Sequence, residues 1–135
     1  MSHLSAFLHP AQTAEVRSVL ISDRFRDENG ASVPFRIRAI TQEENDALTQ
    51  KCRRFRQDRG RREETLDVIQ LNRELVVAAT VEPDFTSAEV CEAFGTKIPT
   101  QVPGKMLLAG EYERLLKAIM DLSGFNEDLE DQAKN

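Results

Sequence analysis

The side chains best suited to catalysis or metal binding are few in this sequence and lie far apart. The two histidines, His3 and His9, fall within the first ten residues, and the two cysteines, Cys52 and Cys91, fall in separate predicted helices. A serine or cysteine nucleophile needs a base within hydrogen-bond reach, and zinc needs closely spaced ligands. No glycine-rich loop leads into Lys-Ser or Lys-Thr either. The sequence therefore predicts no catalytic residue, no cofactor and no metal ion, and we expect a protein that is not an enzyme.

Basic residues are concentrated around Gly60. They are Lys51, Arg53, Arg54, Arg56, Arg59, Arg61 and Arg62. Several arginines close together can hold phosphates or carboxylates through bidentate hydrogen bonds. We favour a simpler interpretation, a solvated loop balanced by glutamates on adjoining helix turns, over a protein partner and, last, a nucleic acid. Phe55 is the one aromatic residue within the cluster, which gives little support to a base-stacking surface.

Composition limits the class of protein further. The chain has 135 residues, 40% hydrophobic and 30% charged, with a formal net charge of −5. This size and balance are typical of one soluble globular domain. The acidic balance argues against a dedicated nucleic-acid binder, whose domain is usually basic. No apolar run approaches the length of a membrane span, and the first residues lack the pattern of a secretory signal, so we expect a cytosolic protein.

A β-hairpin is predicted over residues 15–40, after a short lead segment, residues 1–14. Residues 15–25 favour a strand, and Asn29-Gly30 suits the positive φ angles of a tight turn. From Val33 to Ile40 the residues alternate between apolar and basic side chains, which is typical of a strand with one buried face. Two strands alone are barely stable, so helices must cover the apolar face.

A helix is predicted to follow the hairpin directly. Thr41 and Glu44 have the spacing of a capping box, in which each side chain bonds the backbone N–H of the other. The helix is expected to run from Gln42 to about Gln57. Gly60, shortly after it, interrupts the helical pattern of apolar residues. Its inner side would carry Ala47, Leu48, Cys52 and Phe55.

Three more helices are predicted, which makes about four. Glu64–Thr80 has the broadest apolar surface and should be the central, most buried helix. A short helix should begin at Thr86 and end at Gly95. Residues 97–104, with two prolines, should form a loop that can include one helical turn leading to Met106 and Leu107. The expected architecture is α+β, with the hairpin at residues 15–40 and a mostly helical body at residues 42–125.

The last helix lies within residues 107–125 and has the clearest amphipathic pattern. Its apolar stripe comprises Tyr112, Leu115, Leu116, Ile119 and Met120. Such a helix is marginal alone in water, so the stripe must be covered either by the rest of the chain or by a partner. The remaining segment, residues 126–135, is rich in carboxylates and is expected to be a flexible acidic tail.

Several segments, taken in order, resemble one protein family. They are SAFL, ISDRFRDENG, PFRIRAITQEE, LVVAATVEPDF, AFG, LLAGEYERLLKAI and SGFNEDLEDQAKN. Together they resemble the XkdN-like tail assembly chaperones of tailed phages and prophages, over nearly the whole chain. The resemblance implies a non-catalytic protein that works in the host bacterial cytoplasm. It would bind the long, helical tape measure protein and keep it soluble until the tail tube forms around it, and it would be absent from the mature virion.

The resemblance also suggests which residues contact the partner. We expect Met106, Leu107, Tyr112, Leu116 and Met120 to bind the tape measure protein, although a plain core role for them is at least as well supported by their spacing. The codons of the last three residues can contain a run of adenines on which a ribosome can slip backward. Slippage would produce an extended form of the protein, and this form could recruit the tail tube protein.

Two other functions remain open at this stage. A small nucleic-acid-binding or regulatory protein would use the arginine cluster at residues 53–62, and its affinity would fall steeply with salt. A structural tail component would be present in purified virions. An exposed edge of the predicted hairpin would also offer a route to homo-oligomers by strand addition.

Overall fold

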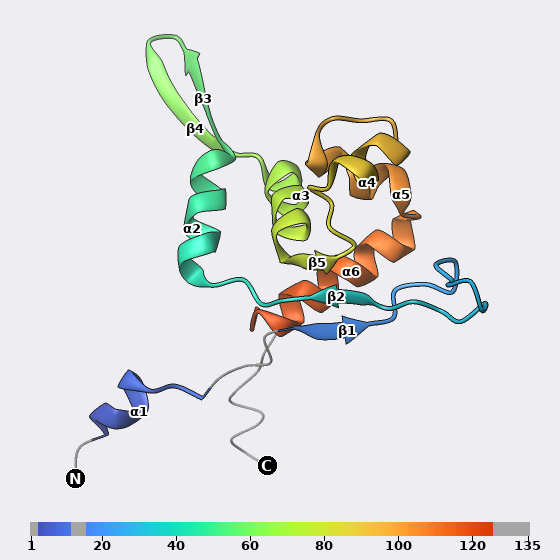
Figure 1. Ribbon diagram of the computed structural model, residues 1–135. Coiled ribbons are helices and arrows are strands. Elements are labelled where there is room, and N and C mark those ends of the chain that lie inside the picture. The colour runs from blue at the N-terminus through green and yellow to red at the C-terminus, as the bar shows by residue number, and fades with distance from the viewer. Residues whose placement is uncertain (1–2, 12–15, 126–135) are drawn as a thin grey trace.

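The computed structural model describes residues 3–11 and 16–125. The predicted acidic tail and parts of the predicted lead segment lie outside these residues. The helices are α1 (Leu4–Leu8), α2 (Gln42–Lys51), α3 (Val68–Ala79), α4 (Ala88–Ala93), the 3-10 helix η1 (Pro99–Gln101), α5 (Val102–Met106) and α6 (Ala109–Leu122). The strands are β1 (Arg17–Val19), β2 (Phe35–Ile37), β3 (Arg53–Asp58), β4 (Arg61–Leu66) and β5 (Thr80–Glu82). The α+β class is confirmed, with more and shorter helices than the four predicted (Figure 1).

The predicted hairpin is confirmed, although its strands are short. β1 and β2 pair antiparallel, with Val19 opposite Phe35. Phe35 and Ile37 are buried while Arg36 between them is exposed, as the alternation predicts. Gly30 has a φ of 80°, which suits its position in the connecting loop.

A third strand, β5, was not predicted. It extends the sheet in the order β1-β2-β5 and follows directly after α3. At the end of the helix the backbone of Thr80 becomes extended, and its hydroxyl donates to the carbonyl of Val76 at 2.7 Å. The helix predicted over residues 64–80 thus ends at Ala79. The residues that follow form β5, which pairs with β2.

The region around Gly60 corrects two predictions. The helix predicted to reach Gln57 ends at Lys51, and the helix predicted from Glu64 begins at Val68 after its N-cap, Asp67. Between them, β3 and β4 form a second antiparallel hairpin instead of a loop. Arg59 and Gly60 both have positive φ, 52° and 78°, which is the geometry of a tight two-residue turn. We call residues 53–66 the arm.

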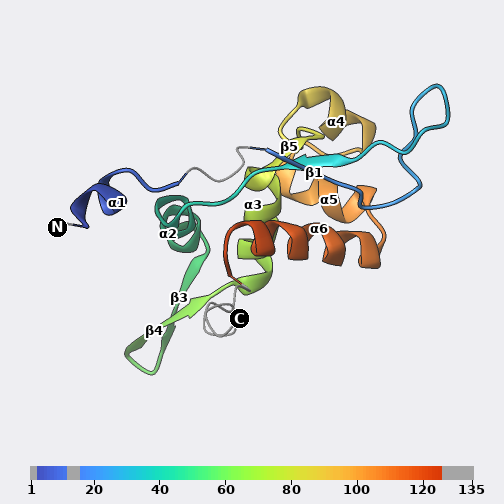
Figure 2. The ribbon, with the colours of Figure 1, turned by 90° about the horizontal axis from the view of Figure 1, so that it is seen from below.

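The core lies between the three-stranded sheet and the helices. α3 is its centre, as predicted, and α2, α5 and α6 pack against it. In Figure 2, which is seen from below, α6 crosses in front of α3. The segment 97–104, predicted as a loop with room for one helical turn, contains η1 and the beginning of α5. Pro99 and Pro103 lie in the first turns of these helices, where a missing N–H costs nothing. The buried apolar residues that pack together in this core are Ile21, Phe35, Ile37, Ile40, Leu75, Val76, Ala79, Phe85, Cys91, Val102, Leu115 and Ile119.

Two glycines in the helical layer should respond to alanine in opposite directions. Gly124 follows α6 with a φ of 89°, so Gly124→Ala should lower the free energy of unfolding by about 1–2 kcal/mol.

Gly104 lies inside α5, where an added Cβ meets nothing within 4 Å. Gly104→Ala should therefore raise stability by about 0.5–1 kcal/mol. Urea denaturation measures both, and a stabilised Gly124→Ala variant would contradict the positive φ of Gly124.

Candidate functional site

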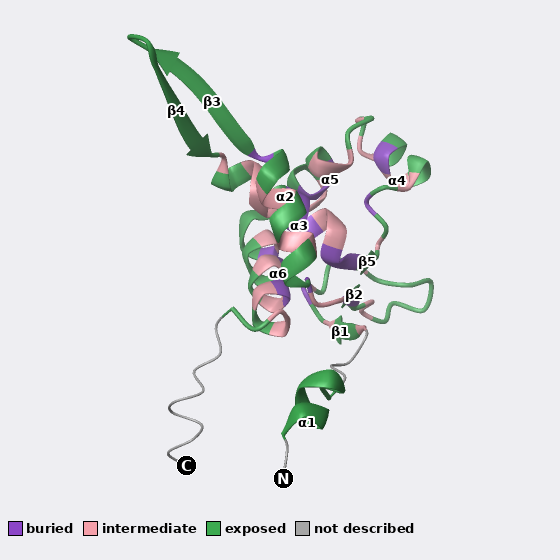
Figure 3. Cartoon of the chain, turned by 90° about the vertical axis from the view of Figure 1, so that its left-hand side faces the viewer, coloured by how far each residue is buried: buried purple, intermediate pink, exposed green. Residues whose placement is uncertain are grey.

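The structure divides the predicted stripe of α6 into two rows. Leu115 and Ile119 are fully buried in the core. Tyr112, Leu116 and Met120, spaced four residues apart, are half-buried and form a row beside them. The partial burial raises the pKa of the Tyr112 hydroxyl. We call these three residues the α6 row; Figure 3 shows the mixture of buried, half-buried and exposed positions along this helix.

The other two predicted contact residues lie at the corner between α5 and α6. Met106 ends α5, Leu107 follows it, and both are half-buried against the core. Met106 also lines a shallow, mostly apolar pocket of about 190 Å³ with Phe25, Phe35 and Pro83. All five predicted residues thus come from one continuous stretch of chain, and all keep part of their surface exposed.

An ion pair holds this corner against the loop between β1 and β2. Glu111 is 2% exposed, and its carboxylate accepts hydrogen bonds from Arg24 at 2.6 and 2.9 Å. Glu111 also accepts from the backbone N–H of Leu108 at 2.7 Å, while Arg24 donates to the carbonyl of Met106 at 3.1 Å. The hydrogen bonds that Glu111 accepts, above all that from Arg24 and also that from Leu108, lower its pKa to about 2.

Two further hydrogen bonds tie α6 to the segments around the sheet. The guanidinium of Arg114 donates to the carbonyl of Ile21 at 2.9 Å, and the N–H of Ile40 donates to the hydroxyl of Ser123 at 2.9 Å. The helix is therefore held at its beginning, middle and end. This fixes the position of the α6 row relative to the rest of the domain.

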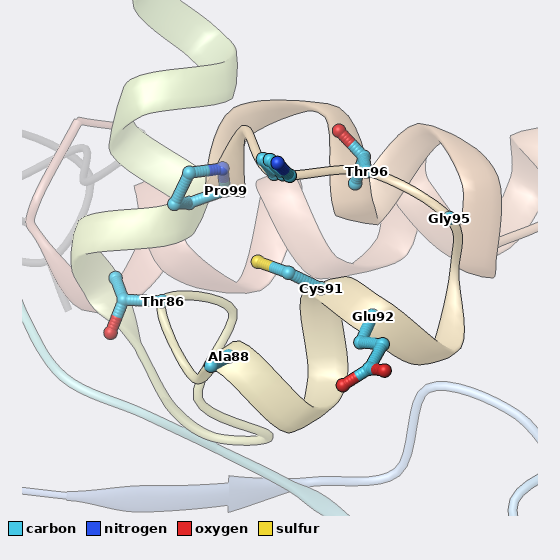
Figure 4. A pocket seen from close by; sticks show the side chains of 8 residues that line it. Thr86, Ala88, Cys91, Glu92, Gly95, Thr96 and Pro99 are labelled. Atoms are coloured by element: carbon cyan, nitrogen blue, oxygen red, sulfur yellow. The ribbon is translucent and has the colours of Figure 1, made fainter.

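A larger pocket than that beside Met106 lies between α4 and the segment that leads to η1. It has a volume of about 580 Å³, and Figure 4 shows Thr86, Cys91 and Pro99 among its lining residues. Cys91 is 6% exposed, and its thiol donates to the carbonyl of Phe85 at 3.3 Å. Sequence analysis did not predict this pocket, because its lining combines ordinary helix-end residues with no shared pattern.

The arm carries the basic cluster apart from Lys51, which ends α2. All twelve residues of β3 and β4 are exposed, which agrees with a solvated cluster but not with a loop. Arg53 pairs with Glu64 at 2.8 Å, and the guanidinium of Arg62 lies 4.1 Å from the centre of the Phe55 ring. Phe55 is thus a stacking partner on the arm, and its predicted place inside a helix was wrong.

The described part of the chain has neither a cluster of metal ligands nor a membrane-spanning helix. Within residues 3–11 and 16–125, no three His, Cys, Asp or Glu side chains gather closely enough to share a metal ion. No helix among these residues is both long and apolar enough to cross a bilayer.

Comparison with known proteins places this domain in a family. Residues 4–135 match the family model described as phage XkdN-like tail assembly chaperone protein. The chain belongs to this family, which confirms the resemblance seen in the sequence.

Individual relatives support the same assignment. The chain is 34% identical to the phage-like element PBSX protein XkdN of Bacillus subtilis (strain 168), over 96% of this chain and 93% of that protein. It is 37% identical to the uncharacterised protein YqbN of the same strain, over 93% of this chain and 87% of YqbN. A crystal structure of YqbN superposes with a TM-score of 0.73 at 31% identity, covering 90% of this chain and 96% of that one.

Proposed function

We propose that this tail assembly chaperone binds the tape measure protein and keeps it soluble until the tail tube forms around it. The observation that carries the proposal is the α6 row, a line of apolar side chains that the domain covers only in part. The proposed activity is binding alone, with no bond made or broken in the client.

The geometry of the α6 row suits an apolar helical client. Tyr112, Leu116 and Met120 are separated by one helical turn each, and Met106 and Leu107 extend the apolar surface at the corner. A client helix with an exposed apolar stripe aggregates unless a surface of this kind covers it. Methionine adapts to irregular partners because its thioether side chain is flexible.

Charge supports the same role. The chain has a formal net charge of −5, and carboxylates exceed basic residues. A complex that carries this charge repels other copies of itself, which keeps the covered client dispersed. The bonds of Glu111, Arg114 and Ser123 hold α6 in place, so little ordering is needed when the client binds.

Co-expression with a tape measure fragment tests the proposal. The double variant Tyr112→Asp, Leu116→Asp should leave most of the fragment insoluble, because two charges would lie in the apolar contact. Lys117→Asp is the matched control, since it changes the net charge by the same amount on the exposed face of α6. Circular dichroism should confirm that both variants fold. Unchanged client solubility with a folded double variant would refute the assignment of the α6 row.

A second form of the protein follows from the same proposal. Ala133-Lys134-Asn135 can be encoded by GCA AAA AAC, on which a ribosome can slip backward. The extended product would recruit the tail tube protein, while the domain common to both forms would bind the client. The nucleotide sequence of the gene tests this directly, since codons without the adenine run would exclude it.

The proposed place of action is the host cytoplasm during assembly, with no copy kept in the mature particle. Mass spectrometry of purified virions should then detect the tail tube and tape measure proteins without this chain. A stoichiometric amount of the chain in virions would instead indicate a structural tail component.

A further inference from the structure

The arm is a two-stranded sheet that stands apart from the body. It projects beyond α2, away from the three-stranded sheet (Figures 1 and 3). Each strand has six residues, and no other strand of the described chain pairs with either edge. Isolated two-stranded hairpins are marginally stable in water, and open edges favour the addition of another strand. A partner that adds a strand to an open edge would therefore stabilise the arm.

The backbone groups of β4 that face its open edge follow from the pairing. The N–H of Asp67 donates to the carbonyl of Cys52 at 2.9 Å, which identifies this as a hydrogen-bonded pair. Hydrogen-bonded and non-hydrogen-bonded pairs alternate along an antiparallel ladder, and the arm has no register shift. The N–H and C=O groups of Arg62, Glu64 and Leu66 consequently point away from β3, toward the open edge.

The charges of β4 are complementary to a reversed copy of the same strand. Its sequence, Arg61-Arg62-Glu63-Glu64-Thr65-Leu66, has two basic residues followed by two acidic residues. An antiparallel copy can set a basic residue of one strand against an acidic residue of the other. β3 has three arginines in its first four residues, so two copies of β3 would place like charges together. Charge complementarity thus selects the β4 edge and a second copy of this chain.

We propose that two chains associate through β4, antiparallel about a two-fold axis at Glu63, to form a four-stranded sheet. In this register Arg62 of each chain lies directly opposite Glu64 of the other. The backbone N–H and C=O groups of these two residues face each other and can form hydrogen bonds between the chains. Opposite charges at directly paired positions stabilise a sheet. Glu63 faces its own copy at the axis, and Arg56, its partner on β3, offsets that repulsion.

Association through the arm would leave the α6 row of each chain exposed. The arm contributes no residue to that row, and α2 separates the arm from the sheet. A dimer of this kind would present two client surfaces to one long polypeptide, which raises the overall affinity without any new contact. The dimer itself does not depend on the proposed client, so the two proposals can fail separately.

Analytical ultracentrifugation of the full chain at several concentrations tests the interface. The chain should form a dimer, and Glu64→Pro should raise the dissociation constant at least about tenfold by removing one edge N–H per chain. Gln57→Pro is the matched control, since Gln57 has the same type of position on the other edge, and it should leave the constant unchanged. A monomeric wild-type chain at the highest attainable concentration, or equal effects of the two prolines, would overturn the proposal.

Charge reversal gives an independent test of the register. Glu64→Arg should weaken the dimer at least about tenfold, because Arg62 then faces an arginine in the other chain. Adding Arg62→Glu to that variant should restore dimerisation, since the pair is re-formed with its signs exchanged. Circular dichroism checks that each variant folds. A double variant that is as weak as Glu64→Arg alone would overturn the assigned register.

Discussion

Leu115→Ala should lower the free energy of unfolding by about 2–5 kcal/mol, the range for removing a fully buried leucine side chain. Leu115 is 0% exposed and lies in the core that α6 shares with the sheet and α3. The lost side chain leaves a cavity that the neighbouring helices cannot easily fill, because hydrogen bonds at the beginning, middle and end of α6 hold it in position. Urea denaturation followed by circular dichroism measures the change.

The adjacent Leu116 provides the matched comparison. It is half-buried, so Leu116→Ala should cost about 1–2 kcal/mol, in proportion to its smaller buried area. The order should reverse in the client assay, where Leu116→Ala weakens solubilisation and a folded Leu115→Ala does not. Equal losses of stability at the two positions would contradict the division of the stripe into a buried row and the α6 row.

Glu111→Gln should change how stability depends on acid pH. The Arg24 pair lowers the pKa of Glu111 to about 2 in the folded chain, below the 4.5 of an unperturbed glutamate. Because the folded pKa is depressed, the carboxylate stabilises the fold fully above about pH 4.5, and this contribution is lost as pH falls toward 2. In the variant this part of the dependence should disappear, so its stability should fall less steeply between pH 4.5 and 2.

Thermal unfolding at a series of pH values from 7 to 2 measures this effect. Glu113→Gln is the control, because it removes a carboxylate from the exposed face of the same helix. Some acid sensitivity should remain in every variant, since the hydrogen bond from Arg38 also lowers the pKa of Glu44 to about 2. A Glu111→Gln profile parallel to that of the wild type would contradict the lowered pKa of Glu111 in the folded chain.

Local signals in the sequence predicted the elements that depend on neighbouring residues. The capping box of Thr41 and Glu44 is present, with each side chain bonded to the backbone of the other. The alternation around Phe35 and Ile37 correctly assigned their burial, and the central position of α3 followed from its broad apolar surface. These features need only a few consecutive positions, so periodicity and capping patterns are sufficient to find them.

Features that depend on distant residues were missed. Arg24 and Glu111 are 87 positions apart, and Glu111 alone resembled an ordinary acidic residue in the first turn of a helix. β5 was missed because Thr80 to Glu82 forms a strand only where β2 lies alongside. The arm was missed because its strands have no buried face, so the apolar alternation that marks a strand is absent. The turn at Arg59-Gly60 was the one local signal available.

The burial of both native thiols has a practical consequence for mapping the complex. Cys52 and Cys91 are 0% and 6% exposed, and burial raises the pKa of the Cys52 thiol, which keeps it in the unreactive protonated form. Maleimide reagents should therefore leave the native chain almost unlabelled. A cysteine introduced at Lys117 or Gln57 would then accept a single fluorophore or spin label. Distances measured from a probe at Lys117, on α6, would report on the position of the client. Distances measured from a probe at Gln57, on the arm, would report on the position of the second copy of the chain.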